Sequence, residues 1–148
     1  MRLSAKSRYA LAATIHMAQA NNKHEYITLV SISDKLDISK IYLEQVFSLL
    51  KRGGIVNSIK GSQGGYQLAD EPQHITVYDL LSSVETSLFE STEETISDKA
   101  PEIEEAVKSV VYQPLDAVVQ QMLKNVTLYD LVSETEKNKS DQNLMFFI

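Results

Sequence analysis

The sequence predicts a mainly helical protein with one small β-hairpin and a long helical segment in its second half. Three patterns support this prediction. Apolar residues fall at helical spacing through much of the first 52 positions, a glycine-rich stretch at 60–65 separates two short β-prone runs, and apolar residues recur in steps of three and four over 103–126. The chain has 148 residues, 43% of them apolar, which suffices for one core with an appendage.

The first helix is predicted to run from the N-cap Ser4 to about residue 20, where a polar run at 21–24 ends it. A short β-prone run follows at 26–29. The N-terminus also has the basic-then-apolar order of a signal peptide, but its apolar part is mostly alanine and is interrupted by polar residues. We therefore expect no signal peptide and a cytoplasmic protein.

Two more helices are predicted before the hairpin. A short one spans about 30–36 and ends in a tight turn at 37–38. Ser39 then caps a third helix that runs to about Arg52, with basic residues in its last turn. The glycine pair at 53–54 is expected to supply the left-handed end of this helix.

Strands are predicted at 55–59 and 66–68, joined by a glycine-rich tip, and a further short helix follows at 77–84. The order of helix, short helix, tight turn, helix and hairpin is that of a winged helix-turn-helix. In this arrangement the second helix braces the third, and the third is free to enter the major groove of DNA. The DNA-binding domain is therefore predicted at 1–84.

Residues 85–100 are predicted to form an exposed acidic loop, because carboxylates alternate there with serine and threonine. Residues 101–132 are predicted to form the dimerisation helices, with a kink or a break at Pro114. Their apolar stripe is long and has little remaining chain to cover it, which favours pairing with a second copy. The predicted dimerisation residues are Ile103, Val107, Val110, Val111, Leu115, Val118, Val119, Met122 and Leu123.

The end of the chain combines a predicted short helix with an apolar terminus. Thr127 can cap a helix over 128–132. The remaining residues, 133–148, are predicted to be a polar stretch followed by a hydrophobic C-terminal tail.

The charge is distributed unevenly between the two halves of the chain. The formal net charge is −6, made of +4 over residues 1–70 and −10 over residues 71–148. A basic half joined to an acidic half indicates one region that meets a polyanion and one that does not. Charge alone leaves open the alternative that both halves are ordinary solvated faces.

The absence of cysteine excludes disulfides, thiol nucleophiles and ordinary iron–sulfur ligation, so no such cofactor is expected. The three histidines are scattered, and the carboxylates of 85–105 are interpreted as a solvated acidic run rather than a metal site. No nucleophile–base–acid set stands out, so we expect no enzyme activity. No apolar run reaches the length that a membrane helix requires, so no membrane partner is expected.

The third helix carries side chains that suit the reading of bases. Near the start of a recognition helix, Gln45 can bond adenine bidentately and Glu44 can accept from cytosine N4, while Ser39 and Tyr42 can reach phosphates. The alternative is a polar solvated face. The full set of predicted DNA-binding residues is Ser4, Arg8, Ser39, Lys40, Tyr42, Glu44, Gln45, Lys51, Lys60, Gly61, Gly64 and Gly65.

The glycine-rich tip has three interpretations. As the wing of a DNA-binding domain, it lets the backbone approach DNA while Lys60 enters the minor groove or meets a phosphate. A nucleotide-binding phosphate loop would have to lead into a helix N-terminus, and this tip leads into a strand. A plain hairpin turn remains the third interpretation, and the order of the helices favours the wing.

Three segments of the sequence, 1–11, 42–45 and 58–68, closely resemble a family of bacterial winged-helix repressors. That family includes the iron–sulfur assembly regulator (IscR), the nitric-oxide-sensing repressor (NsrR) and the cysteine-metabolism repressor (CymR). The resemblance covers roughly residues 1–85, and the later helical stripe fits more loosely. It implies a homodimeric transcription factor, joined through its long helix, that binds a partly palindromic operator.

The chain departs from the family pattern at two places. The wing of that family usually carries arginine where Lys60 stands, and lysine lacks the planar fork of arginine. Family members that bear an iron–sulfur cluster have three cysteines in the loop corresponding to about 89–101, and this chain has none. The chain is therefore predicted to be a cysteine-free member that is not an iron–sulfur sensor.

The apolar end of the chain has two possible roles. The cysteine-metabolism repressor ends similarly and acts with cysteine synthase, which binds peptides that end in isoleucine. By this resemblance, Phe146, Phe147 and Ile148 can dock in an effector enzyme such as cysteine synthase. The other role is that the tail packs back onto its own dimer.

Taken together, the sequence predicts a cytoplasmic, homodimeric repressor whose partners are double-stranded DNA and a second copy of the chain. The alternative from another class is a protein-interaction adaptor, built on a winged helix that no longer binds DNA. The acidic net charge and the lysine in the wing keep that alternative open. Strong salt dependence of binding would distinguish DNA phosphates from a protein groove.

Overall fold

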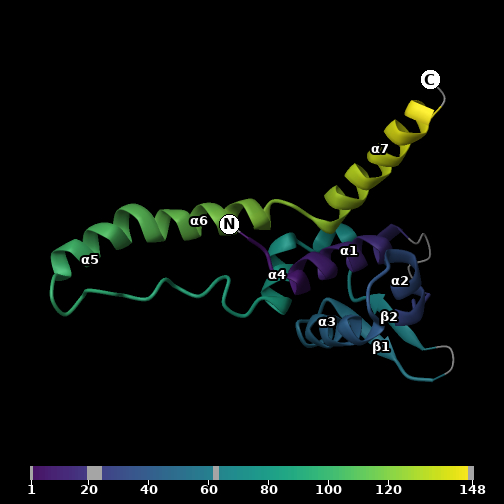
Figure 1. Cartoon of the computed structure of the whole chain (residues 1–148), viewed down its shortest axis with the longest axis horizontal. Coiled ribbons are helices and arrows are strands. Elements are labelled where there is room, and N and C mark those ends of the chain that lie inside the picture. Colours follow the sequence, from purple (N-terminus) through teal and green to yellow (C-terminus); the bar gives the residue numbers. More distant parts are fainter. Residues whose placement is uncertain (1, 20–24, 62–63, 147–148) are drawn as a thin grey trace.

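A helical head and a long helical rod make up the computed structural model, which describes residues 2–19, 25–61 and 64–146 (Figure 1). The predicted fold class, mainly α with one small hairpin, is confirmed. The elements in chain order are α1 (Ala5–Gln19), α2 (Leu29–Leu36), α3 (Lys40–Arg52), β1 (Val56–Ile59), β2 (Gly65–Leu68), η1 (Pro72–His74), α4 (Val77–Val84), α5 (Pro101–Val107), η2 (Lys108–Tyr112), α6 (Gln113–Lys124) and α7 (Leu128–Phe146).

Side-chain caps fix the start of the two helices that form the helix-turn-helix. The Thr28 hydroxyl accepts from the backbone N–H of Ser31 at 3.2 Å and begins α2. The turn between the helices passes through Asp37, whose φ of 54° is left-handed. The Ser39 hydroxyl then accepts from the backbone N–H of Tyr42 at 3.4 Å and begins α3, as the sequence predicts.

The predicted left-handed end of α3 is confirmed within the glycine pair and is supplied by Gly54 alone. Gly54 has a φ of 78°, whereas Gly53 has a φ of −79° and stays right-handed. A Cβ atom on Gly53 would overlap the side chain of Ser83. Gly53 is therefore required for the close packing of the end of α3 against α4.

The core of the head lies where α3 meets α1, α2, α4 and β1. Each of these helices contributes one apolar face, and Leu128, the first residue of α7, is also buried in this core. The side chains with no exposed surface include Ala10, Ala13, Ile32, Leu43, Val46, Phe47, Leu50, Leu80 and Leu128.

The hairpin is held by main-chain pairing on both sides of β2. β1 and β2 are antiparallel, with Val56 opposite Leu68 and Ile59 opposite Gly65. Ile27, in the predicted β-prone run, exchanges two backbone hydrogen bonds of 2.8 Å with Tyr66. Gly65 has a φ of 151°, and a Cβ atom there would press on the Ile27 carbonyl, so this position requires glycine.

The rod stays helical through Pro114, so of the two predicted outcomes the break does not occur, and the helix is irregular directly before the proline. α5, η2 and α6 follow one another without interruption, and η2 is a wide π-turn directly before the proline. In it, the Gln113 N–H donates to the Lys108 carbonyl, five residues back. A regular α-turn would force the proline ring against the carbonyl of Val110, and the wide turn relieves that clash.

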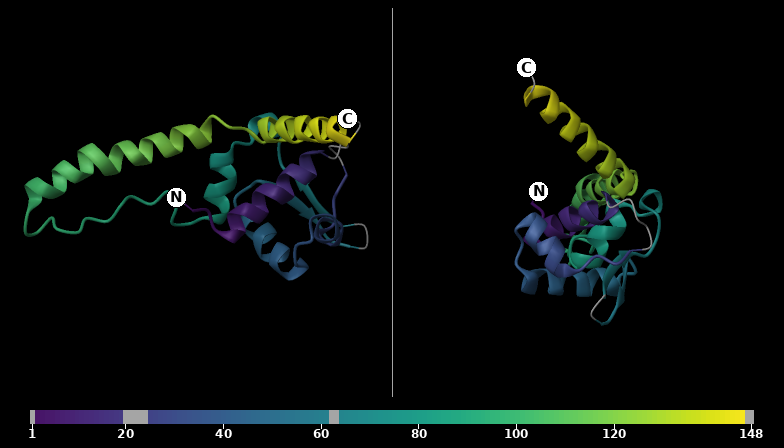
Figure 2. Two further views of the ribbon diagram at one scale, coloured as in Figure 1. Left: turned by 45° about the horizontal axis from the view of Figure 1, so that its top comes forward. Right: turned by 90° about the vertical axis from the view of Figure 1, so that its right-hand side faces the viewer.

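The last helix is longer than predicted. A helix over 128–132 is correct at its start, where Thr127 and Asp130 cap each other reciprocally at 2.9 and 3.1 Å. The prediction is wrong at the end, because α7 continues through the polar stretch to Phe146. That stretch contains no glycine or proline, and α7 packs against α1, where the Gln19 amide donates to the Glu136 carboxylate at 2.9 Å. The helix therefore continues beyond the end of the apolar periodicity. Figures 1 and 2 show α7 leaving the head at an angle to the rod.

The acidic loop at 85–100 forms no helix or strand, as predicted. It runs from α4 alongside the rod to the start of α5 (Figure 1). One carboxylate departs from the predicted solvated run. Glu104 on α5 is only 5% exposed and accepts from the backbone N–H groups of Thr95 and Ile96 at 3.3 and 3.2 Å. This carboxylate ties the end of the loop to α5.

Candidate nucleic-acid interface

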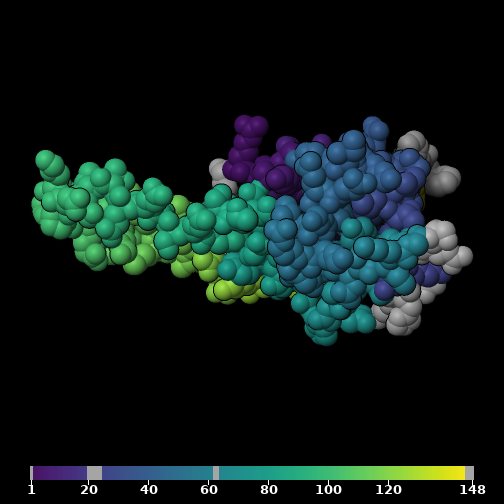
Figure 3. Space-filling model, turned by 90° about the horizontal axis from the view of Figure 1, so that it is seen from below, coloured from purple at the N-terminus to yellow at the C-terminus, as the bar shows by residue number. Residues whose placement is uncertain are grey.

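The exposed side of α3 carries one stripe directly opposite its buried side. Ile41, Gln45, Ser48 and Arg52 follow one another in steps of four and three, and all four are exposed. At about 3.6 residues per turn, these steps keep one line along the helix. The core-facing residues of α3 lie on the other side, so this stripe is the part of the helix that projects farthest from the head. Figure 3 shows α3 and the hairpin on one face of the molecule.

The first turn of α3 brings several of the predicted DNA-binding residues together. Ser39 caps the helix, and the Lys40 Nζ lies 3.9 Å from a carboxylate oxygen of Glu44, one turn along. Tyr42 is half-buried and makes an edge-on contact with Tyr9 of α1, with ring centroids 5.0 Å apart. This contact fixes the start of α3 beside the start of α1.

The wing presents its cation at the end of β1. Lys60 is exposed directly after the strand, and the Gly64 N–H donates to the Gly61 carbonyl at 3.0 Å across the tip. Ring centroids of Tyr66 on β2 and Phe47 on α3 are 4.8 Å apart. The wing is thus anchored to the core-facing side of the recognition helix.

Two of the predicted residues, Ser4 and Arg8, lie at the N-terminal end of α1. The Ser4 hydroxyl accepts from the Ser7 N–H at 3.2 Å, which confirms the predicted N-cap. Arg8 is exposed next to Tyr9, and therefore beside the start of α3. Lys51 does not join this group, because it lies near the opposite end of α3, roughly 16 Å along the axis from Lys40.

Comparisons with known proteins identify the family. The model of a family called Rrf2, described as an iron-dependent transcriptional regulator, matches residues 3–134. The chain belongs to the Rrf2 family. The regulator CymR of Bacillus subtilis is 34% identical over 148 residues, which is all of both chains, and the regulator IscR of Klebsiella pneumoniae is 32% identical over 92% of this chain and 82% of its own.

Solved structures agree in fold as well. The B. subtilis structure described as CymR, the global cysteine regulator, matches with a TM-score of 0.73 and 33% identity, covering 90% of this chain and 98% of that one. The structure of IscR from T. potens matches with a TM-score of 0.71 and 29% identity, covering 93% and 90%. This Rrf2 protein is accordingly a DNA-binding transcriptional regulator, and its relatives are regulators rather than enzymes.

The family description names iron, but this chain has no cysteine to hold an iron–sulfur cluster of the usual kind. Iron–sulfur clusters are held mainly by cysteine thiolates, and the sequence contains no cysteine. Among the described residues, no group of three histidine or acidic side chains is placed to hold a metal ion.

None of the described helices is long and apolar enough to span a membrane.

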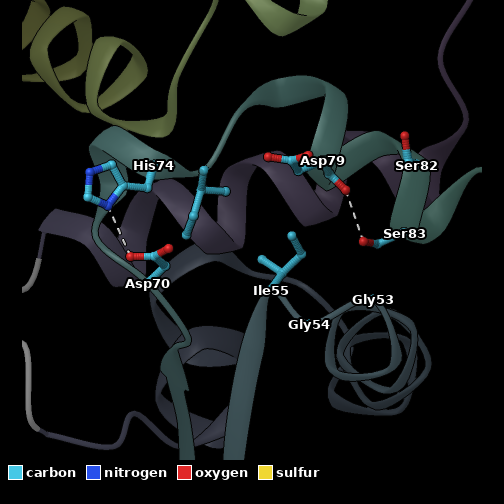
Figure 4. Close-up of a pocket in the computed structure, with 9 residues that line it drawn as sticks. Gly53, Gly54, Ile55, Asp70, His74, Asp79, Ser82 and Ser83 are labelled. Atoms are coloured by element: carbon cyan, nitrogen blue, oxygen red, sulfur yellow. Dashed lines mark hydrogen bonds and ion pairs between the residues drawn. The ribbon is translucent and has the colours of Figure 1, made fainter.

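A polar hollow of about 430 Å³ lies between the end of α3 and α4, at the far end of α3 from Ile41 (Figure 4). The polar groups around it bond one another. The His74 Nδ1 lies 3.1 Å from an Asp70 carboxylate oxygen, and the Ser83 hydroxyl donates to the Asp79 carbonyl at 2.9 Å. The hollow lies at the end of α3 that carries Lys51, at the opposite end from the first turn with Lys40 and Ile41.

Sequence reasoning missed two residues that bear on this face. Glu85, the first residue after α4, accepts from the Ser7 hydroxyl at 2.8 Å and from the Ser4 N–H at 3.3 Å, so it holds the start of α1. Glu85 is 81 residues from Ser4 and 78 from Ser7, and no sequence pattern links residues so far apart. Ile41 was overlooked because it is apolar, although its place four residues before Gln45 puts it on the same line.

The carboxyl of Glu85 gives a testable pH dependence. Hydrogen bonding from Ser4, followed by that from Ser7, lowers the pKa of Glu85 below its usual value. Because the pKa of Glu85 is lower in the folded protein than in the unfolded chain, its ionised carboxylate stabilises the fold at a pH above the unfolded-state pKa. This contribution is lost as the pH falls through the folded-state pKa. Below about pH 4.5, the free energy of unfolding should therefore decrease less steeply with falling pH in Glu85→Gln than in the parent.

The measurement is denaturant unfolding at intervals from pH 6 to pH 3, comparing the parent with Glu85→Gln. Glu90→Gln, at an exposed position of the same loop, is the matched control and should follow the parent. Identical pH profiles for the parent and Glu85→Gln would contradict the role assigned to this carboxylate.

The predicted docking tail falls largely outside the described residues. Phe147 and Ile148 are beyond them, and of Phe146 only the backbone, at the end of α7, is described. Docking of an effector enzyme on this tail therefore stays a prediction.

Proposed function

We propose that this Rrf2 regulator is a homodimeric repressor in which two copies of α3 enter the major groove of a partly palindromic operator. The observation that carries the proposal is the outward stripe of α3, which bears Gln45, on the face of the molecule where the hairpin with the exposed cation Lys60 also lies (Figure 3). A helix with base-bonding side chains along its projecting line, next to a basic hairpin, suits the two adjacent grooves of DNA.

Each predicted contact is assigned a part in this proposal. Gln45 and Glu44 read base edges from the first two turns of α3. Ser39, Lys40, Tyr42 and Arg8 meet phosphates around the start of that helix, and Ser4 does so through the end of α1. Lys51 meets the backbone farther along. Lys60, with Gly61, Gly64 and Gly65, forms the wing contact.

The rod supports pairing with a second copy. The predicted apolar stripe has a half-buried part and an exposed part. The half-buried residues are Val107, Val119 and Leu123, and α6, which carries the last two, contacts α4. The other six predicted residues are at least half exposed: Ile103 51%, Val110 73%, Val111 50%, Leu115 54%, Val118 66% and Met122 59%. An apolar face of this length is the kind that homodimers bury.

Repression follows from occupancy of a promoter, because a dimer across it obstructs polymerase without further machinery. This mode of action places the protein in the cytoplasm with the DNA. The adaptor alternative is not favoured, since the relatives that match the whole chain are transcriptional regulators. The C-terminal tail keeps both roles described above, docking in an effector enzyme or packing on the dimer.

Two substitutions test the division between base contacts and phosphate contacts. Gln45→Ala should cost about 1–3 kcal/mol on the operator and little on random DNA, because it removes a base contact. Lys60→Ala should weaken binding to both DNAs similarly and lower the salt slope by about one, because it removes a phosphate contact. Affinity is measured by titration at several salt concentrations.

The matched controls are Gln73→Ala and Lys99→Ala, at exposed positions away from α3 and the wing. Both controls should bind like the parent. Equal losses for Gln45→Ala and Lys60→Ala on operator and random DNA would refute the proposed division of roles.

A further inference from the structure

We propose that Ile41 reads a thymine methyl group in the operator, and so determines specificity at an A·T base pair. This inference rests on the proposed function, in which α3 lies in the major groove. It adds a residue and a base to that function, since the polar side chains alone do not explain an isoleucine on this face.

Ile41 occupies the projecting line of α3. The buried residues of the helix are Leu43, Val46, Phe47 and Leu50, and the direction opposite to them passes through Ile41 and Gln45. Ile41 lies in the first turn, which is the part of a recognition helix that contacts base edges. A side chain here points toward the floor of the groove rather than toward the phosphates at its rim.

The exposure of Ile41 is large for an isoleucine in this head. It is 70% exposed, compared with 51% for Val30 and 50% for Ile59. The residues next to it on the exposed side of α3 are Lys40, Glu44 and Gln45, all polar, so Ile41 is the one apolar residue among them. In the major groove, the apolar group available to such a side chain is the C5 methyl of thymine.

Ile41 and Gln45 together match one kind of base pair. Residues four apart on a helix have Cβ atoms about 5–6 Å apart, and successive base pairs are about 3.4 Å apart. The two side chains therefore reach the same or adjacent base pairs. Glutamine bonds the N6 and N7 atoms of adenine, and isoleucine packs on the methyl of thymine, so both favour A·T.

DNA is favoured over a protein partner as the occupant of this face. Residues 1–70 carry a net charge of +4, Lys40 and Arg52 are exposed at the two ends of α3, and the apolar face of the rod is a separate surface. A protein that docked here would need an apolar patch larger than one side chain.

The experiment replaces thymine by deoxyuridine, which pairs identically but lacks the methyl. Each thymine of one operator half-site is replaced in turn, and the Kd of the full-length dimer is measured for the parent and for Ile41→Ser. At one or two positions, uracil should weaken parent binding about fourfold per half-site, as expected for one buried methyl. Ile41→Ser should bind the thymine operator more weakly and should not distinguish thymine from uracil at those positions.

Ile96→Ser, in the acidic loop, is the matched control and should retain the full response to uracil. Thermal unfolding of Ile41→Ser should match the parent, because the side chain is exposed. The inference is overturned if uracil has no effect at any position, or if it weakens the parent and Ile41→Ser equally. Failure of the proposed function looks different: the parent would then find no specific operator at all.

Discussion

Aspartate at both Val118 and Met122 is expected to separate the dimer into monomers and to lower operator affinity about 100-fold or more. Both side chains lie on the exposed apolar line of α6, at 66% and 59% exposed. Burying two carboxylates against a second copy would cost more than the contact returns. Without pairing, each monomer binds one half-site separately. The protein then loses the gain in affinity that comes from linking two binding modules, which is typically about 10²–10⁴-fold.

The measurement combines analytical ultracentrifugation with DNA titration. Gln113→Asp with Ala117→Asp is the matched control, since these two exposed residues are also four apart on α6 but lie on a different side of the rod. The control should remain dimeric. A dimeric Val118→Asp/Met122→Asp protein, or a monomeric one with the operator affinity of the parent, would contradict the account.

Phe47→Ala is expected to lower the free energy of unfolding by about 3–5 kcal/mol, the largest effect on stability that the head offers. Phe47 is fully buried on α3, and its ring lies 4.8 Å, centroid to centroid, from that of Tyr66 on β2. The substitution leaves a cavity between the recognition helix and the wing. Binding to the operator should fall as well, because the two DNA-contacting elements lose their shared support.

Urea unfolding checks this prediction. Phe47→Leu, which keeps most of the volume, should cost less than Phe47→Ala. Ser48→Ala, at the next and exposed position, should change stability by less than about 0.5 kcal/mol. A cost below about 1 kcal/mol for Phe47→Ala would show that this ring does not hold the head together.

The head could be predicted closely because its local signals agree with one another. Ser39 and Thr127 are cap residues by type, and each begins a helix where predicted. The apolar spacing of α3 identified its buried side, and hence its exposed side. The glycine-rich tip and its flanking β-prone runs gave the hairpin.

The remaining features depend on contacts that no local pattern reveals. The carboxylate of Glu85 meets Ser4 and Ser7 only after folding. In the sequence Glu104 cannot be distinguished from the solvated carboxylates near it, and its burial depends on its hydrogen bonds with the backbone of Thr95 and Ile96. α7 was predicted too short because apolar periodicity stops before the helix does. The assignment of Ile41 required knowledge of which side of α3 remains uncovered, and an apolar residue is easily mistaken for core.

The central claim, that this chain is a dimeric repressor of specific promoters, is tested most directly by selection from genomic DNA. The purified full-length protein is incubated with fragments of its own genome at low and at near-physiological salt, and the retained fragments are sequenced. We expect retention of a few promoter fragments that share an inverted repeat, with half-sites separated by about one helical turn or a multiple of it. Retention of no fragments, or of all fragments and only at low salt, would contradict the claim.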